Sequence, residues 1–182
     1  MRPTAVVYIA TSLDGYISRE DGSIDLLAQV EDAQAFQRFE SFLATVDAVV
    51  MGRNTFLQVL GFGQWPYRQI PVYVLSESLR KLPEGCPSNV HLRSRPPEEL
   101  LAELGSLHRI YVDGGLTVRG FLEKDLIDEL TISRIPIILG SGRTLFGPVP
   151  YELKYRHVST EAFPNGIVQS KFVRMNSSSL KT

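Results

Sequence analysis

The sequence predicts an α/β domain of three layers, in which helices flank a mainly parallel central sheet and an antiparallel hairpin closes the C-terminal edge. Two observations favour this fold class. Short, β-rich apolar runs alternate with amphipathic segments as far as residue 122, and three extended segments then follow without a helix between them. Parallel strands need a long crossover whereas antiparallel strands need only a turn, so the first order indicates parallel pairing and the second a hairpin. Residues 1–175 are therefore expected to form one domain, and residues 176–182 a flexible polar tail.

Apolar, β-branched runs predict the strands of the parallel part. They lie at residues 5–11 (AVVYIAT), 47–51 (DAVVM), 71–76 (PVYVLS), 90–92 (VHL) and 109–112 (RIYV). The three C-terminal extended segments lie at 128–139 (DELTISRIPIIL), 155–163 (YRHVSTEAF) and 166–175 (GIVQSKFVRM). The last two are joined around Pro164-Asn165-Gly166, which is typical of a hairpin turn.

Helical spacing of apolar residues predicts the covering helices. The first stripe consists of Phe36, Phe39, Phe42, Leu43 and Val46. A short helix is expected over 54–60, and a third begins near Pro96-Pro97-Glu98-Glu99, where proline and acidic residues suit a first turn. The last helix is expected over residues 117–122.

Composition excludes several classes of function. The chain of 182 residues has a formal charge of −1, which gives no electrostatic case for nucleic acid or for an anionic membrane as a partner. Cys86 is the only cysteine, so an intrachain disulfide and a thiolate zinc cluster are excluded. The three histidines lack partners at ligand spacing, and no metal site is expected. Without a signal peptide or a membrane-length apolar run, a soluble cytoplasmic protein is expected.

The carboxyl ends of the predicted strands carry phosphate-compatible residues. In an open α/β sheet, ligands bind beyond these ends. Gly52 and Gly114-Gly115 each lead from a strand directly into a helix, whose first N–H groups and positive dipole end suit a phosphate. Taken singly, Gly114-Gly115 and Ser76 are better explained as turn residues, and Gly52-Arg53 is explained equally well as a structural glycine beside a solvated arginine. Several such groups on one rim favour a site for a nucleotide phosphate pair.

Other nucleotide and catalytic motifs are missing. The glycine segments do not fit G-x-G-x-x-G, and there is neither a Walker A lysine motif nor a serine nucleophile elbow. The sequence thus offers groups that bind a cofactor and little for covalent catalysis. This asymmetry is expected where a cofactor carries the chemistry.

Four segments, IATSLDGYISREDGSID, DAVVMGRNTF, YVLS and YVDGGLTVRGFL, occur in this order, within a likeness that covers roughly residues 5–147. As a set they resemble the dihydrofolate reductase-like superfamily, in particular the branch that contains the reductase domain of riboflavin biosynthesis and the small stand-alone bacterial reductases. The resemblance implies an NADPH-binding reductase with a central sheet of about eight strands.

By the same resemblance, five short segments would hold NADPH. The residues at 10 and 14–17 would lie at the nicotinamide, and those at 52–55 would hold the diphosphate and the 2′-phosphate side. The residues at 75–76 would lie beside the adenosine half, and those at 114–118 would surround the diphosphate. The residues implied are Ala10, Asp14, Gly15, Ile17, Gly52, Arg53, Asn54, Thr55, Leu75, Ser76, Gly114, Gly115, Leu116, Thr117 and Val118.

The chain departs from the superfamily where a substrate would bind. Folate reductases carry a carboxylate on the first helix, whereas this helix offers Ala35, Phe36 and Gln37, which puts folate reduction in question. The residue after Asp25 is typically tryptophan in the small stand-alone reductases and is Leu26 here.

Asp25 is the candidate for steering protonation, because a carboxylate in a closing loop would be partly desolvated and its pKa raised. The alternatives are water, Glu31 or Asp32. Phe36, Phe62 and Trp65 are candidates to stack on a flat substrate.

The leading hypothesis is an NADPH-dependent reductase that transfers hydride to a small heterocyclic, pterin- or pyrimidine-like substrate. The alternative is an NADP(H)-binding protein of the same fold without efficient catalysis. A third reading is a resistance-type or stress-response reductase with broad substrates. Because no helices cover the C-terminal extended segments, a homodimer through this sheet edge is also expected.

Overall fold

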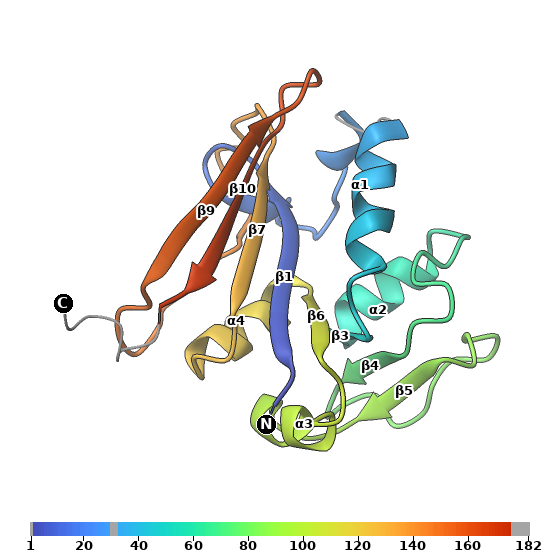
Figure 1. Cartoon of the computed structure of the whole chain (residues 1–182). Helices are drawn as coiled ribbons and strands as arrows, with labels where there is room; N and C mark the ends of the chain where they lie inside the picture. Colours follow the sequence, from blue (N-terminus) through green and yellow to red (C-terminus); the bar gives the residue numbers. More distant parts are fainter. Residues whose placement is uncertain (1, 30–32, 176–182) are drawn as a thin grey trace.

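The computed structural model describes residues 2–29 and 33–175. An eight-stranded sheet has the order β5-β4-β3-β6-β1-β7-β10-β9, and a separate pair joins β2 to β8 (Figure 1). The elements are β1 (Thr4–Thr11), β2 (Tyr16–Ser18), the 3-10 turn η1 (Leu27–Gln29), α1 (Ala33–Leu43), β3 (Ala48–Gly52), α2 (Arg53–Leu60), β4 (Val72–Leu75), β5 (Val90–Arg93), α3 (Pro97–Glu103), β6 (Arg109–Asp113), α4 (Gly115–Glu123), β7 (Glu129–Arg134), β8 (Arg143–Thr144), β9 (Tyr155–Ala162) and β10 (Val168–Arg174).

Strand pairing follows the predicted division of the chain. All neighbours from β5 to β7 pair in parallel, whereas β10 pairs antiparallel with both β7 and β9. The prediction of an α/β fold with about eight strands, flanking helices and a C-terminal antiparallel hairpin is confirmed.

The strand order explains which face of the sheet each helix covers. Crossovers between parallel strands are right-handed, so the direction in which the chain steps along the sheet decides the face. The steps β1 to β3 and β3 to β4 run toward β5, and they place α1 and α2 on one face. The steps β5 to β6 and β6 to β7 run the other way, and they place α3 and α4 on the opposite face.

The core is accordingly divided by the sheet. On β3, Ala48 and Val50 face the cluster that contains α3 and α4, while Val49 and Met51 face the cluster of α1 and α2. All four side chains are fully buried. This alternation with a period of two is what two covered faces require of a strand.

Two details differ from the sequence prediction. Segment 128–139 is extended only as far as Arg134, because Pro136 cannot donate to a ladder. The β2–β8 pair was not predicted, since two- and three-residue strands leave no periodic signal. Residues 30–32 and 176–182, which include Glu31, Asp32 and the predicted tail, lie outside the described residues.

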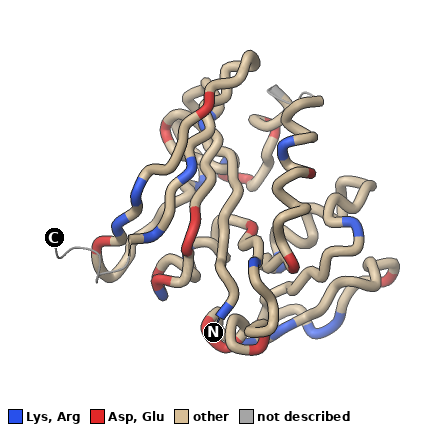
Figure 2. Tube along the Cα trace, viewed as in Figure 1, with Lys and Arg blue, Asp and Glu red and all other residues tan. Residues whose placement is uncertain are grey.

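Neither sign of charge occupies a whole side of the molecule (Figure 2). Within residues 2–29 and 33–175, no helix is long and apolar enough to cross a membrane.

Candidate functional site

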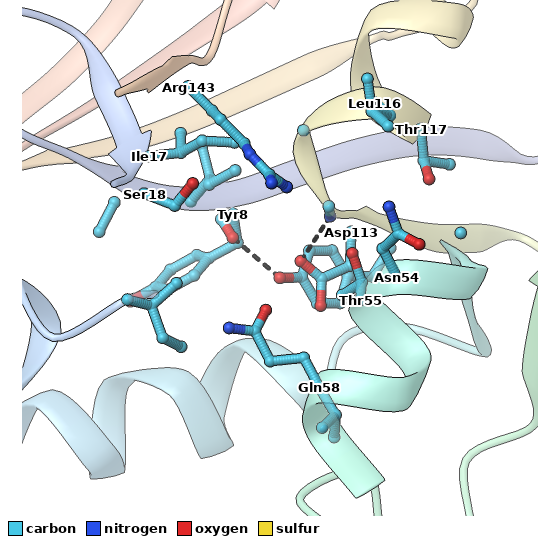
Figure 3. Close-up of a pocket in the computed structure, with 18 of the residues that line it drawn as sticks. Tyr8, Ile17, Ser18, Asn54, Thr55, Gln58, Asp113, Leu116, Thr117 and Arg143 are labelled. Atoms are coloured by element: carbon cyan, nitrogen blue, oxygen red, sulfur yellow. Dashed lines mark hydrogen bonds between the residues drawn. The ribbon is translucent and has the colours of Figure 1, made fainter. Parts of the chain in front are cut away.

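A cleft of about 1840 Å³ lies beyond the carboxyl ends of the central strands. Its walls come from α1, α2 and α4 and from the ends of β1, β3, β4 and β6 (Figure 3). The sequence-predicted residues that line it are Ala10, Ile17, Phe36, Gly52, Arg53, Asn54, Thr55, Phe62, Leu75, Ser76, Gly114, Gly115, Leu116 and Thr117.

Two helices begin at this cleft without side-chain caps. The N-cap residues of α2 and α4 are Gly52 and Gly114, neither helix has a capping side-chain hydrogen bond, and neither has an acidic residue in its first turn. The first N–H groups of a helix have no acceptor within the helix. Both helices therefore direct free N–H groups and the positive ends of their dipoles at the same cleft.

The glycines at these strand ends are required by close packing. Gly114 has φ of +87°, and a Cβ there would collide with the side chain of Thr55. A Cβ at Gly115 would collide with Ile17, and one at Gly52 would lie 2.9 Å from Thr117 Oγ1. The backbone thus forms the surface of the cleft here, which is the cradle that a diphosphate needs.

Polar side chains gather where α2 meets the end of β4. The Arg53 guanidinium donates to Ser78 Oγ at 2.7 Å and to Asn54 Oδ1 at 3.2 and 3.3 Å. Ser76 and Arg95 line the same end. A guanidinium with hydroxyl neighbours can form forked hydrogen bonds to a phosphate.

Asp113, which the sequence reasoning missed, lies where β6 meets α4. Figure 3 shows it beside Asn54 and Thr55. Tyr67 donates its phenolic hydrogen to Asp113 Oδ2 at 2.7 Å, and the Gly114 N–H donates to Oδ1 at 2.8 Å. Burial raises the pKa of Asp113 above its ordinary value, despite the opposing effect of these donors. The signal that could identify it in the sequence is a carboxylate at the carboxyl end of a buried strand, directly before a glycine pair.

The other end of the cleft has a polar floor and apolar walls. Gln169 Nε2 donates to Ser133 Oγ at 2.8 Å and to Tyr8 Oη at 3.1 Å. Since both hydroxyls accept from the amide, their own hydrogens are available to other acceptors. Phe36 on α1 and Phe62 after α2 are each more than half exposed at the cleft.

Five predicted residues, Asp14, Gly15, Asp25, Trp65 and Val118, lie outside the lining of the cleft. Asp14 accepts from Ser12 Oγ at 2.6 Å and from the Gly140 N–H at 2.8 Å, so it fixes the loop that contains Gly15 against residues 139–140. Val118 is fully buried in the core. Trp65 packs edge-on against Phe56 and Tyr67.

Asp25 also lies outside the lining, and the pKa expected for it is wrong. Its exposed carboxylate accepts from Arg19 Nε at 2.8 Å. This hydrogen bond lowers the pKa of Asp25 below its ordinary value. The desolvation that would have raised the pKa is outweighed, because Arg19 reaches back to the carboxylate from the same loop. Whether Asp25 takes part in proton transfer stays a prediction.

No group of three or more His, Cys, Asp or Glu side chains in the described ranges is placed to hold a metal ion.

Two proteins are similar to this chain over almost its whole length. YwjB of Bacillus subtilis (strain 168), an uncharacterized protein, is 36% identical over 177 residues, which cover 96% of this chain and 99% of that one. The crystal structure of a putative riboflavin biosynthesis protein from Shewanella sp. PV-4 is 37% identical and superposes with a TM-score of 0.89 over 95% of this chain and 99% of that one.

A dihydrofolate reductase from Enterococcus faecalis, solved in complex with NADP(H), has 18% identity and a TM-score of 0.64 over 95% of this chain and 97% of that one. This likeness shows a shared fold. The family model described as RibD C-terminal domain matches residues 3–169. The chain therefore belongs to the RibD C-terminal domain family.

Proposed function

We propose that this protein is an NADPH-dependent reductase that transfers hydride to a small conjugated, pterin- or pyrimidine-like substrate. The observation that carries the proposal is the convergence of two uncapped helix N-termini on one cleft. Such an arrangement suits two linked phosphates, and the fold is shared with a reductase solved with NADP(H).

The residues divide the work of binding between backbone and side chains. The first N–H groups of α2 and α4 would bind the diphosphate, with Thr55 and Thr117 beside them. Arg53 and Ser76 would bind the 2′-phosphate, which distinguishes NADPH from NADH. The bound cofactor supplies the hydride, and the chain supplies orientation and a proton.

Asp113 is the proposed proton source. With Glu77, it is one of two carboxylates among the described lining residues, and Glu77 is exposed beside Ser76. A raised pKa increases the fraction of the acid form, which is the form that can donate a proton. That form is lost as the pH rises through the pKa of Asp113, so turnover should fall toward alkaline pH.

One observation favours the alternative of a binding protein without efficient catalysis. Both oxygens of Asp113 already accept hydrogen bonds, from Tyr67 and from the Gly114 N–H. If Asp113 were held as a structural acceptor, NADPH would bind but would not be consumed.

Single-turnover oxidation of bound NADPH by a panel of conjugated carbonyl compounds separates the two functions. We expect Asp113→Asn to lower the rate by roughly 10²- to 10⁴-fold, the usual contribution of a positioned acid, while NADPH affinity changes little. Glu77→Gln is the matched control and should leave the rate unchanged. Tight NADPH binding without oxidation by any compound would favour the alternative.

We also propose that the protein forms a homodimer through β9. This strand is the sheet edge, and its residues from Arg156 to Ala162 are exposed, including the apolar side chain of Val158. Light scattering at micromolar concentration should give the mass of two chains, and Val158→Asp should shift it toward one. A wild-type monomer, with and without NADPH, would contradict the proposal.

A further inference from the structure

Tyr67 brings a buried hydroxyl group to the cleft from the segment between α2 and β4. Its side chain is only 2% exposed, yet the residue belongs to the cleft lining, as does Asp113. The phenolic hydrogen is donated to Asp113 Oδ2 at 2.7 Å. The two residues are 46 positions apart in the chain, so this hydrogen bond joins the loop after α2 to the carboxyl end of β6.

The fold holds the Tyr67 ring in place. The ring lies edge-on to Trp65, with 5.2 Å between the ring centres, and Trp65 in turn lies edge-on to Phe56 of α2. The Tyr67 carbonyl accepts from the Ile70 N–H at 2.9 Å, and Asn89 donates its side-chain amide to the Ile70 carbonyl at 2.6 Å. A side chain locked by packing and by an anchored turn can hold a partner in one orientation. Tyr67 is thus built to fix the carboxyl group that it contacts.

The two hydrogen-bond partners of Asp113 differ in what they can do. Oδ1 accepts from the Gly114 N–H at 2.8 Å, and an N–H group can only donate. A phenolic oxygen can both donate and accept. When Asp113 is ionised, Tyr67 donates to Oδ2. When Oδ2 carries a proton, the same phenol can accept it. Tyr67 therefore suits both protonation states of Asp113.

Uncharged groups surround the Asp113 carboxyl group. Besides Tyr67 and the Gly114 N–H, Tyr111 of β6 acts on it, and Tyr111 donates its own hydrogen to the Tyr8 carbonyl at 3.0 Å. The positive end of the α4 dipole also favours the carboxylate form.

Figure 3 places two more uncharged side chains, Asn54 and Thr55 of α2, beside Asp113. Arg143, the charged side chain labelled in the same view, donates to the Glu20 carbonyl at 3.1 and 3.2 Å. The phenol of Tyr67 is therefore the side-chain donor that Asp113 receives directly.

Tyr67 is not itself the acid. Burial and the neighbouring Asp113 raise the pKa of Tyr67 well above its ordinary value. The phenol therefore stays protonated and gives up its hydrogen less readily than an exposed tyrosine would. Its contribution is a hydrogen bond that persists at any pH near neutrality.

We propose that Tyr67 is a positioning residue for the reduction: it orients the Asp113 carboxyl group and stabilises the carboxylate that proton transfer leaves behind. The proposal rests on the proposed function, because it takes Asp113 as the proton source. In this step the Asp113 O–H bond breaks and an N–H or O–H bond forms at one end of a substrate double bond. The carbon at the other end gains the hydride, and NADPH becomes NADP⁺. Water then returns a proton to Asp113.

The first test measures the protonation of Asp113 directly, without cofactor or substrate. The protein is labelled with carbon-13 at the aspartate side-chain carboxyl groups, and the Asp113 signal is assigned by its loss in Asp113→Asn. Because the Tyr67 hydrogen bond favours the carboxylate, Tyr67→Phe should raise the titration midpoint of Asp113 by about 1–2 pH units. Tyr67→Met also lacks a donor and should move the midpoint in the same direction.

The second test follows single-turnover oxidation of bound NADPH across a range of pH. Tyr67→Phe should lower the rate at neutral pH roughly 10-fold, because the acid is weaker and less well oriented, and NADPH affinity should not change. The fall of the rate in alkali should move upward by the same amount as the Asp113 midpoint. In an Asp113→Asn background Tyr67→Phe should have no further effect, since Tyr67 acts through Asp113.

Tyr155→Phe is the matched control. Tyr155 on β9 also donates its phenolic hydrogen within the protein, to the Ile127 carbonyl at 3.0 Å, and it lies outside the cleft lining. Both substitutions remove one hydrogen bond of a phenol, so they should lower the thermal midpoint to a similar extent. Only Tyr67→Phe should change the Asp113 titration and the pH profile of turnover.

An unmoved Asp113 midpoint in Tyr67→Phe overturns the proposal, as does a moved midpoint that leaves the rate and its pH profile unchanged. Equal changes in Tyr155→Phe also overturn it, because they would reflect a general loosening of the fold. These failures concern Tyr67 in a protein that consumes NADPH. A wild-type protein that oxidises NADPH with none of the compounds refutes the proposed function itself, and with it the assignment of Tyr67 to proton transfer.

Discussion

The two ends of the cleft are built in different ways. The phosphate-compatible end uses backbone N–H groups and glycines that are contiguous in sequence, as at Gly114 to Thr117. The other end uses side chains from distant parts of the chain: Tyr8 and Gln169, which share a hydrogen bond, are 161 residues apart. A site made of backbone at a strand end can be recognised in a short motif, whereas a site made of converging side chains depends on the strand order.

The largest effect should come from breaking the backbone end. Gly114→Ala places a Cβ at φ of +87° against Thr55, which should lower the free energy of unfolding by about 2–5 kcal/mol and abolish tight NADPH binding. Denaturant titration and calorimetry measure the two effects.

The control is Gly120→Ala in the same helix, where a Cβ meets no atom within 4 Å. It should be neutral or slightly stabilising. Adding Thr55→Ala to Gly114→Ala should recover part of the loss by relieving the collision. A Gly114→Ala protein with unchanged stability and NADPH affinity would show that the backbone cradle is not needed.

The second largest effect should come from removing a side chain at the phosphate-compatible end, which separates the side-chain contribution to NADPH binding from that of the backbone. Arg53→Ala should weaken NADPH binding by about 1.5–3 kcal/mol, the value of a hydrogen bond to a charged group, and leave NADH binding nearly unchanged. Calorimetry on the apo protein measures both, with the exposed Arg80→Ala as a control. Equal affinities of the wild type for NADPH and NADH would exclude a 2′-phosphate site at Arg53.

A third substitution, Glu129→Gln, lies outside both ends of the cleft and tests whether only changes in the cleft affect NADPH binding. Burial alone would raise the pKa of Glu129, but Arg109 at 2.8 Å and Lys171 at 3.0 Å lower it below its ordinary value. Glu129→Gln should cost about 1–2 kcal/mol of stability at pH 7 and leave NADPH affinity unchanged.

The contribution of Glu129 to the free energy of unfolding should decrease as the pH falls. A carboxylate with a lowered folded-state pKa contributes stability above its unfolded pKa, and this contribution is lost as the pH falls through the folded value. Denaturation curves of wild type and Glu129→Gln should therefore converge in acid, from about pH 4.5 downward. A constant difference between them at all pH values would mean that the ion pairs do not stabilise the fold.

The smallest effect should come from Asp25→Asn. Because Asp25 is exposed and paired with Arg19, we expect single-turnover oxidation of NADPH to change less than about threefold. Asp113→Asn provides the contrast. A large loss of turnover in Asp25→Asn with intact NADPH binding would indicate that Asp25 steers protonation and would argue against Asp113 as the proton source.

The sequence by itself determined the class of fold and one end of the cleft. Periodicity located the strands and helices, and the order of elements separated the parallel part from the hairpin. Gly52 and Gly114 were identified because a strand, a glycine and a helix start form a local pattern whose backbone geometry follows from neighbouring residues. The same holds for Arg53, since it is fixed by its place in the first turn of α2.

Only the tertiary structure decided which side chains share the cleft and in what electrostatic state. It paired Asp25 with Arg19, which lowers the pKa of Asp25, whereas the loop position of Asp25 predicted a raised pKa. It placed Asp113 beside Tyr67 in a buried position, and the pKa of Asp113 is the one that is raised. It also brought Arg38 onto Phe163. A pKa depends on burial and on neighbours that come from other segments, and no local pattern specifies which segments become neighbours in the sheet.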